Sequence, residues 1–156
     1  MSKEIIEGAA APDFTAPCDG GETLQLSSLK GKNIVLYFYP RDDTPGCTKE
    51  SSEFAQFQQR FTDRNTVIIG VSKDSVTKHD KFKSKYNLPF NLVSDEEGSI
   101  CESYGVWQEK KNYGRTYMGI SRSTFLIDEK GDVRKIWRKV RVTDHVEAVL
   151  TAVEEL

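Results

Sequence analysis

The stretch Ile34-Val35-Leu36-Tyr37-Phe38-Tyr39-Pro40 decides the fold of this 156-residue chain. Six consecutive apolar or aromatic residues, stopped by a proline, are typical of a strand that is covered on both faces. Strands of this kind lie inside a sheet that carries helices on its two sides. We therefore expect residues 34–39 to form the central strand of an α/β structure.

The segment after this strand has the periodicity of a helix. Phe54, Phe57 and Phe61 recur at spacings of three and four residues, which predicts one apolar stripe on a helix from about residue 44 to residue 62. A buried strand followed by an amphipathic helix is the first unit of an alternating α/β chain.

The rest of the chain repeats this alternation and opens and closes with hairpins. Strands and helices in this order predict a thioredoxin-like fold, with a mixed central sheet, helices on both faces and an N-terminal β-hairpin extension. The further elements that we expect are an opening hairpin of Phe14–Pro17 and Thr23–Leu26 around Asp19-Gly20-Gly21, a strand at 66–71, a helix at 76–86, a strand at 92–93, a short helix begun by a capping box of Ser94 and Glu97, a hairpin of 123–127 and 133–137, and a helix at 146–153.

Composition and charge exclude several classes of protein. Hydrophobic residues make up 37% and charged residues 29%, and no repeat or linker divides the chain, so we expect residues 1–156 to form a single domain. Lysine and arginine number 22 against 24 acids, which leaves no basic excess for a nucleic acid. Acids interrupt the N-terminus and no segment approaches the roughly 18 apolar residues of a membrane span, so we expect no membrane partner and a cytoplasmic location.

The three cysteines predict one reactive thiol. Cys18, Cys47 and Cys101 are widely spaced and form neither a disulfide framework nor a C-x-x-C pair. Thr44 is a favourable N-cap and Pro45 suits the first helical position, which places Cys47 at the third. A sulfur at that position faces free backbone N–H groups and the positive end of the helix dipole, and both favour thiolate over thiol.

The spacing around Cys47 resembles a known motif. Pro40-x-x-x-Thr44-x-x-Cys47 matches the Pro-x-x-x-Thr/Ser-x-x-Cys motif of the peroxiredoxins. The chain is similar to the branch called bacterioferritin comigratory protein, or Q-type peroxiredoxin. The segments that carry this closer similarity are Tyr37-Phe38-Tyr39-Pro40, Thr44-Pro45-Gly46-Cys47-Thr48, Leu92-Val93-Ser94-Asp95 and Arg122-Ser123-Thr124-Phe125-Leu126-Ile127.

The resemblance implies an antioxidant thiol peroxidase. Cys47 would attack the terminal oxygen of hydrogen peroxide or a small organic hydroperoxide, giving a sulfenic acid and water or an alcohol. It further implies that the Thr44 hydroxyl and the Arg122 guanidinium stabilise the reacting oxygens and that Pro40 shields the sulfur. Arg41 is the rival to Arg122 for this role.

In this family the sulfenic acid is commonly attacked by a second, resolving cysteine, and this chain lacks that cysteine at the usual positions. Relatives of this branch carry a second cysteine at one of two positions, which here hold Ser52 and Lys83. We therefore predict a one-cysteine cycle in which an external thiol, either thioredoxin, glutaredoxin or glutathione, attacks the sulfenic acid. Resolution by Cys101 or Cys18 is the alternative, although a packing role suits both better.

No bound cofactor or metal is expected. The two histidines, His79 and His145, are far apart, and no Cys/His cluster has ligand spacing. No glycine-rich fingerprint follows a strand in the manner of a dinucleotide site. The resemblance favours a monomer.

Three aromatic residues stand between the third helix and Arg122. Trp107, Tyr113 and Tyr117 lie in a stretch of poor periodicity, so we expect a loop that crosses near the active site and covers the pocket of Cys47.

Two other functions compete with the peroxidase. A thioredoxin-type disulfide oxidoreductase needs a partner thiol three residues from Cys47, but Thr44 and Glu50 occupy those positions. A non-enzymatic holdase chaperone would use exposed apolar surface and would not need the thiol.

Overall fold

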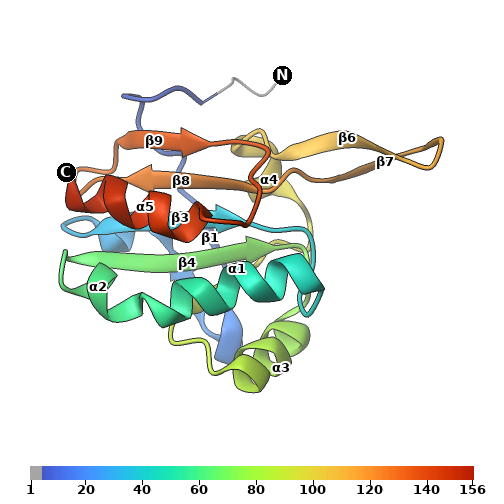
Figure 1. The fold of residues 1–156 in the computed structure, drawn as a ribbon, viewed down its shortest axis with the longest axis horizontal. Coiled ribbons are helices and arrows are strands. Elements are labelled where there is room, and N and C mark those ends of the chain that lie inside the picture. The colour runs from blue at the N-terminus through green and yellow to red at the C-terminus, as the bar shows by residue number, and fades with distance from the viewer. Residues whose placement is uncertain (1–4) are drawn as a thin grey trace.

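The computed structural model describes residues 5–156, and Figure 1 shows a central sheet with helices packed against it. The strands are β1 (Thr15–Pro17), β2 (Thr23–Gln25), β3 (Asn33–Phe38), β4 (Thr66–Ser72), β5 (Asn91–Ser94), β6 (Trp107–Asn112), β7 (Arg115–Ile120), β8 (Ser123–Ile127) and β9 (Val133–Trp137). The helices are α1 (Pro45–Gln56), α2 (Gln58–Thr62), α3 (Val76–Tyr86), α4 (Ser99–Ser103) and α5 (His145–Glu154), with short 3-10 turns η1 (Asp19–Gly21) and η2 (Leu26–Leu29).

Strand β3 lies at the centre of a five-stranded sheet, as predicted. The strand order is β5-β4-β3-β8-β9. β3 pairs in parallel with β4 and antiparallel with β8, so the sheet is mixed. All six residues of β3 are buried, which explains why its sequence is apolar without alternation.

The two faces of the sheet carry two separate cores. Alternate residues of β3 point to opposite sides, so Leu36 and Phe38 join one core and Val35 and Tyr37 the other. Residues of the β1–β2 hairpin and of α4 pack into the first core, and residues of α1, α2, α3 and α5 pack into the second. The predicted thioredoxin-like arrangement, with helices on both faces and an N-terminal hairpin, is confirmed.

A glycine in β4 makes room for the contact that seats α1. A Cβ at Gly70 would lie 2.9 Å from the Tyr37 phenol and 2.9 Å from Leu92. Without it, Tyr37 fits over β4 and its hydroxyl makes a 2.8 Å hydrogen bond with Ser51 Oγ on α1. The start of α1, where Cys47 lies, is thereby fixed relative to β3.

The predicted single helix over residues 44–62 is wrong, because it is divided at Phe57. Phe57 leaves the helical region (φ −97°, ψ 8°) and separates α1 from α2. The change of direction brings Phe61 against Phe54, with ring centroids 6.0 Å apart. The rings of Phe54 and Phe61 are fully buried, whereas Phe57 is only half-buried. A single straight helix with one apolar stripe would bury all three phenylalanines to a similar extent.

The predicted capping box of Ser94 and Glu97 is also wrong. α4 begins only at Ser99, after Gly98 in the left-handed conformation (φ 83°). The free N–H groups of its first turn donate instead to the Asp95 carboxylate, from Ile100 at 3.2 Å and from Cys101 at 2.8 Å. The buried carboxylate of Asp95, rather than a pair of serine and glutamate side chains, therefore accepts the hydrogen bonds of the free N–H groups at the start of α4.

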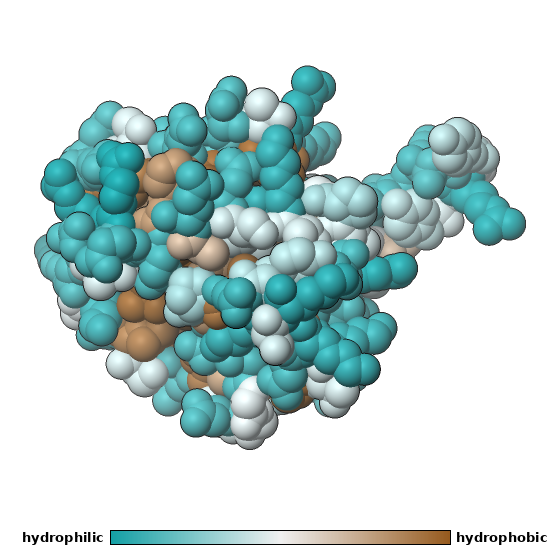
Figure 2. Space-filling model, turned by 60° about the horizontal axis from the view of Figure 1, so that its bottom comes forward, coloured by the Kyte–Doolittle hydropathy of each residue, from teal (hydrophilic) through white to brown (hydrophobic). Residues whose placement is uncertain are grey.

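The stretch from Trp107 to Tyr117 is a β-hairpin and not the predicted loop. β6 and β7 pair antiparallel and turn at Tyr113 and Gly114, whose φ values are 50° and 77°. The hairpin projects from the body of the molecule in Figures 1 and 2. Since most of its outer residues are exposed on both faces, its sequence has no apolar alternation by which a strand could be recognised.

The remaining expected strands and helices are present at the expected places. Among the helices of residues 5–156, none has the length and apolar character that crossing a membrane requires.

Candidate active site

Cys47 occupies the third position of α1, as predicted. Pro45 is the first helical residue and Thr44 is the N-cap. The Cys47 side chain is buried, with 1% of the residue exposed. Thr44 is thus the N-cap residue, as predicted, but its hydroxyl donates to the carbonyl of Arg41 at 2.9 Å and makes no hydrogen bond to the helix.

Arg122 lies immediately before β8, which pairs antiparallel with β3, and it contacts the sulfur. Its Nη2 donates to Cys47 Sγ at 3.3 Å, and its Nη1 donates to Glu50 Oε1 at 2.7 Å. A positive charge at this distance favours the thiolate. Burial alone would lower the pKa of Arg122, but Glu50 and Cys47 raise it above its ordinary value.

A glycine permits this approach. A Cβ at Gly46 would lie 3.2 Å from Nη2 of Arg122, which is tighter than ordinary van der Waals contact. With a side chain at position 46, the guanidinium would have to shift by a few tenths of an ångström from its place against the helix start. Arg41, the rival in sequence, is exposed at the pocket and makes no hydrogen bond to Cys47 among the described residues.

Glu50 belongs to the site and was not expected from the sequence. It lies one turn after Cys47 on α1 and is fully buried. Burial raises the pKa of Glu50 to about 7, although Arg122 opposes the shift. The signal in the sequence was its spacing, since residues three apart on a helix share a face.

His145, the first residue of α5, closes the buried side of this group. Its Nε2 lies 2.8 Å from Thr124 Oγ1 and 3.9 Å from Glu50 Oε2, which has no hydrogen-bond partner among the described residues. Burial and Arg122 lower the pKa of His145 to about 4. A neutral imidazole therefore borders the Glu50–Arg122 pair at pH 7.

A pocket of about 800 Å³ opens at Cys47. It brings together the four residues predicted for the site, Pro40, Thr44, Cys47 and Arg122. Its other lining residues are Arg41, Lys73, Asp74, Ser75, Lys78, Glu96, Trp107, Lys110, Tyr117, Met118, Gly119 and Ile120.

The hairpin β6–β7 forms one wall of this pocket. Trp107 and Tyr117 line it, which places two of the three expected aromatic residues near the active site. Tyr113 lies at the hairpin tip, fully exposed and outside this pocket. Lys110 was not expected; burial and Arg122 lower its pKa while Cys47 opposes the shift.

The other two cysteines are separated from Cys47 by the sheet. Cys18 and Cys101 pack in the core that contains Leu36, whereas Cys47 packs in the core of Tyr37. Burial and Asp19 raise the pKa of Cys18, and burial with Asp95 raises the pKa of Cys101 strongly.

Ser52 and Lys83 occupy the two positions at which the resemblance led us to look for a resolving cysteine. Lys83 on α3 forms an ion pair with Asp19 at 2.7 Å. Ser52 is half-buried on α1, five residues after Cys47. Neither side chain can form a disulfide.

One group of possible metal ligands lies beside the site within residues 5–156. The side chains of Asp42, Asp74 and His79 offer atoms within 4.8 Å of one another. Each of these atoms already takes part in a hydrogen bond within the protein. The expectation of a site without metal stays a prediction.

Comparison with known proteins agrees with this geometry. Residues 8–136 match the model of the AhpC/TSA family. Peroxiredoxin Bcp of Bacillus subtilis (strain 168) is 53% identical over 156 residues, covering 100% of this chain and 98% of the relative. The chain belongs to the AhpC/TSA family and is a peroxiredoxin.

More distant relatives and solved structures place this peroxiredoxin in the predicted branch. Peroxiredoxin Bcp of Escherichia coli (strain K12) is 35% identical over 148 residues, which cover 95% of each chain. A structure of a PrxQ mutant from Xylella fastidiosa superposes with a TM-score of 0.93 at 35% identity, covering 99% of this peroxiredoxin and 98% of that chain. The bacterioferritin comigratory protein of Xanthomonas campestris, whose structures concern alkyl peroxide reduction, gives a TM-score of 0.90 at 40% identity over 98% of each chain.

Proposed function

We propose that Cys47 is the peroxidatic residue of this thiol-dependent peroxidase. Its thiolate attacks the terminal oxygen of a hydroperoxide, an S–O bond forms and the O–O bond breaks. The sulfur is oxidised to a sulfenic acid, and the departing oxygen takes a proton and leaves as water or an alcohol. The observation that carries this proposal is the 3.3 Å contact between Arg122 Nη2 and Cys47 Sγ at the base of an open pocket.

Three further residues have proposed roles in that step. Arg122 keeps the sulfur ionised and donates to the oxygens on which negative charge develops. Thr44 lines the same pocket, and its hydroxyl, which donates to the carbonyl of Arg41 at 2.9 Å, must turn from that oxygen to donate to the peroxide. Pro40 lines the pocket without offering a backbone N–H, so it limits the access of water to the sulfur.

We propose hydrogen peroxide and small organic hydroperoxides as substrates. The pocket combines cationic side chains with the apolar parts of Trp107, Tyr117 and Ile120. Such a lining accepts an organic group beside the peroxide. The alkyl peroxide reduction described for the Xanthomonas campestris relative supports the same class.

An external thiol completes the proposed cycle. Because Cys18 and Cys101 are buried on the opposite face of the sheet, an internal disulfide with Cys47 requires the core to open. A thiol from outside condenses with the sulfenic acid, releasing water and forming a mixed disulfide. A second thiol then releases Cys47 and leaves as an external disulfide. Thioredoxin, glutaredoxin and glutathione are the reductants that we propose.

We propose that residues 1–156 act as a single domain and as a monomer in a reducing compartment, the cytoplasm. The three free, buried cysteines support the compartment. Light scattering should give the mass of one chain, and a dimer mass would contradict the monomer.

The test of the proposed function is peroxide consumption with dithiothreitol, measured for wild type and for Cys47→Ser. We expect rapid consumption by wild type and none above background by the variant. A matched control is Cys101→Ala, which should retain the wild-type rate. A holdase would protect client proteins equally well after Cys47→Ser, and a disulfide oxidoreductase would reduce insulin without consuming peroxide.

A further inference from the structure

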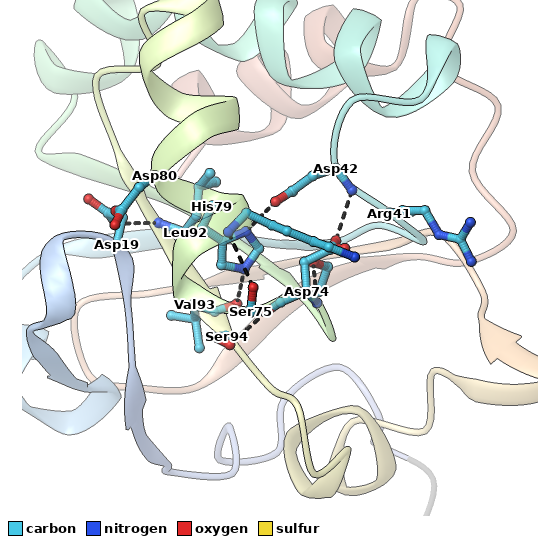
Figure 3. Close-up of polar contacts among 12 residues, drawn as sticks. Asp19, Arg41, Asp42, Asp74, Ser75, His79, Asp80, Leu92, Val93 and Ser94 are labelled. Atoms are coloured by element: carbon cyan, nitrogen blue, oxygen red, sulfur yellow. Dashed lines mark hydrogen bonds and ion pairs between the residues drawn. The ribbon is translucent and has the colours of Figure 1, made fainter.

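A buried histidine holds the loop in front of Cys47. His79, on α3, is fully buried, and both of its ring nitrogens face oxygen atoms (Figure 3). Nε2 lies 2.9 Å from the carbonyl oxygen of Val93, and Nδ1 lies 2.6 Å from Oδ2 of Asp42. Asp42 belongs to the loop between β3 and α1, two residues before Thr44.

The partners of His79 determine where its protons are. A carbonyl oxygen can only accept, so Nε2 carries a proton. Oδ1 of Asp42 accepts from the hydroxyl of Tyr39 at 2.5 Å, and burial raises the pKa of Tyr39 well above its ordinary value, so that phenol remains a donor. At 2.6 Å a proton must lie between Nδ1 and Oδ2, because two lone pairs would repel at that distance.

The same loop is held through its main chain. The N–H of Asp42 donates to Oδ2 of Asp74 at 2.8 Å, and Ser72 Oγ donates to the same oxygen at 2.6 Å. Asp74 precedes α3, so the β4–α3 connection fixes the backbone of Asp42 while His79 fixes its side chain.

The next residue is gripped by α3 as well. Asp43 has φ 58°, a left-handed conformation that is unfavourable for a residue with a side chain. Its carboxylate accepts from Lys85 Nζ at 2.8 Å and from Tyr86 Oη at 2.6 Å. Two consecutive loop residues are thus held by one helix.

We propose that His79 is a positioning residue for the peroxidatic centre: hydrogen-bonded to Val93 through Nε2 and to Asp42 through Nδ1, it fixes the loop that sets Thr44 and Cys47 against Arg122. This inference rests on the proposed role of Cys47. The pair of His79 and Asp42 is buried and hydrogen-bonded on both sides, a condition under which loss of one partner strongly disturbs the other. His79 does not touch the substrate pocket, so it acts through the loop.

A spectroscopic measurement on wild type tests the protonation directly. Long-range ¹H–¹⁵N NMR spectra distinguish protonated from unprotonated ring nitrogens, and His79→Gln or His145→Gln assigns the signals of the two histidines. We expect a proton on Nε2 of His79 and a proton shared between Nδ1 and Oδ2 of Asp42. A spectrum without a proton on Nε2, or without a proton shared by Nδ1 and Asp42, would overturn the proposal, and this result does not depend on whether a variant folds.

A kinetic measurement tests the positioning. We expect His79→Gln and Asp42→Asn each to slow oxidation of Cys47 by peroxide by about tenfold or more, since small displacements of reacting groups cost rate. The double variant should be no slower than the slower single variant, because one interaction is lost in each case. The matched control is Asp80→Asn on the same helix, whose carboxylate accepts from Gly20 N–H away from the loop.

The two proposals fail in different ways. Wild type that consumes no peroxide, or an active Cys47→Ser variant, would end the proposed function. Active wild type with His79→Gln and Asp42→Asn as fast as Asp80→Asn would overturn the positioning role alone. Urea unfolding of each variant separates the two effects, since lowered stability with an unchanged oxidation rate also contradicts positioning.

Discussion

At Cys47, one guanidinium donates to two buried side chains. Arg122 donates to the sulfur and to the carboxyl group of Glu50; Cys47 and Glu50 are buried, and Arg122 is partly buried. Such a pair is worth little as a source of stability, but removing one member leaves a buried charge without compensation. The arrangement therefore orients the arginine more than it stabilises the fold.

Replacing Arg122 should damage catalysis directly. We expect Arg122→Met to lower kcat/KM for peroxide by on the order of 10² to 10³, the cost of losing a donor aimed at developing negative charge. Arg122→Lys should recover only part of this loss, because an ammonium cannot donate to Glu50 and the sulfur in the same planar geometry. Steady-state kinetics with excess dithiothreitol measures both, and a larger loss from Arg41→Met than from Arg122→Met would contradict the assignment.

Glu50 should make the free energy of unfolding depend on pH, and the direction of this dependence follows from its pKa. Its folded pKa, about 7, lies above the ordinary value of 4.5, so between these values the folded state holds a proton that the unfolded state has lost. The stability from this group is therefore present below pH 4.5 and is lost as the pH rises to 7, by about 3 kcal/mol in total.

The variant Glu50→Gln should not show this loss of stability with rising pH, because glutamine does not titrate. His145 contributes the opposite slope between pH 4 and its ordinary value of 6.5, since its folded pKa is depressed, and this contribution is shared by both proteins. We therefore expect the free energy of unfolding of Glu50→Gln, relative to wild type, to rise between pH 5 and pH 8. Urea denaturation at the two pH values measures the difference, and parallel pH profiles would show that Glu50 is not titrating there.

At the scale of elements, the start of α1 couples helix geometry to catalysis. Alanine is favoured over glycine in a helix, so Gly46→Ala should leave the free energy of unfolding unchanged or raise it by up to about 1 kcal/mol. Its Cβ would lie 3.2 Å from Nη2 of Arg122 and should push the guanidinium from the sulfur.

We accordingly expect Gly46→Ala to lose about tenfold in kcat/KM for peroxide without loss of stability. Peroxide kinetics and urea unfolding, measured on the same preparation, test whether activity falls while stability is kept. Equal activity would mean that Arg122 can move aside without consequence for Cys47.

The elements that periodicity could reveal were predicted, and the others were not. The buried run of β3 and the apolar stripes of α3 and α5 face a core, so their sequences carry the pattern of their geometry. The hairpin β6–β7 has water on both faces over most of its length and therefore no such pattern. The division at Phe57 and the role of Asp95 depend on packing between elements, which no single segment encodes.

The residues of the site also fall into those that the sequence could predict and those that it could not. Cys47, Thr44 and Pro40 lie within eight residues, and their spacing was enough to place them together. Arg122 lies 75 positions from Cys47 and was reached only through resemblance to a family. Glu50, Lys110 and His79 needed the folded chain, because burial and a distant partner give these common residue types their roles.

At the scale of the molecule, the sheet keeps the three cysteines apart. Cys47 lies in one core and the other two lie in the core on the opposite face, so the fold itself opposes an internal disulfide. The pKa values of Cys18 and Cys101 are also raised, so neither residue readily supplies a thiolate. This separation supports the proposal that a thiol from outside returns Cys47 to its starting state.

The most direct test of this account is mass spectrometry of the protein after one equivalent of hydrogen peroxide, with dimedone present to trap sulfenic acid. The account predicts one dimedone adduct, on the peptide that contains Cys47, with Cys18 and Cys101 still free thiols. An adduct on another cysteine, or quantitative conversion to an internal disulfide, would contradict it.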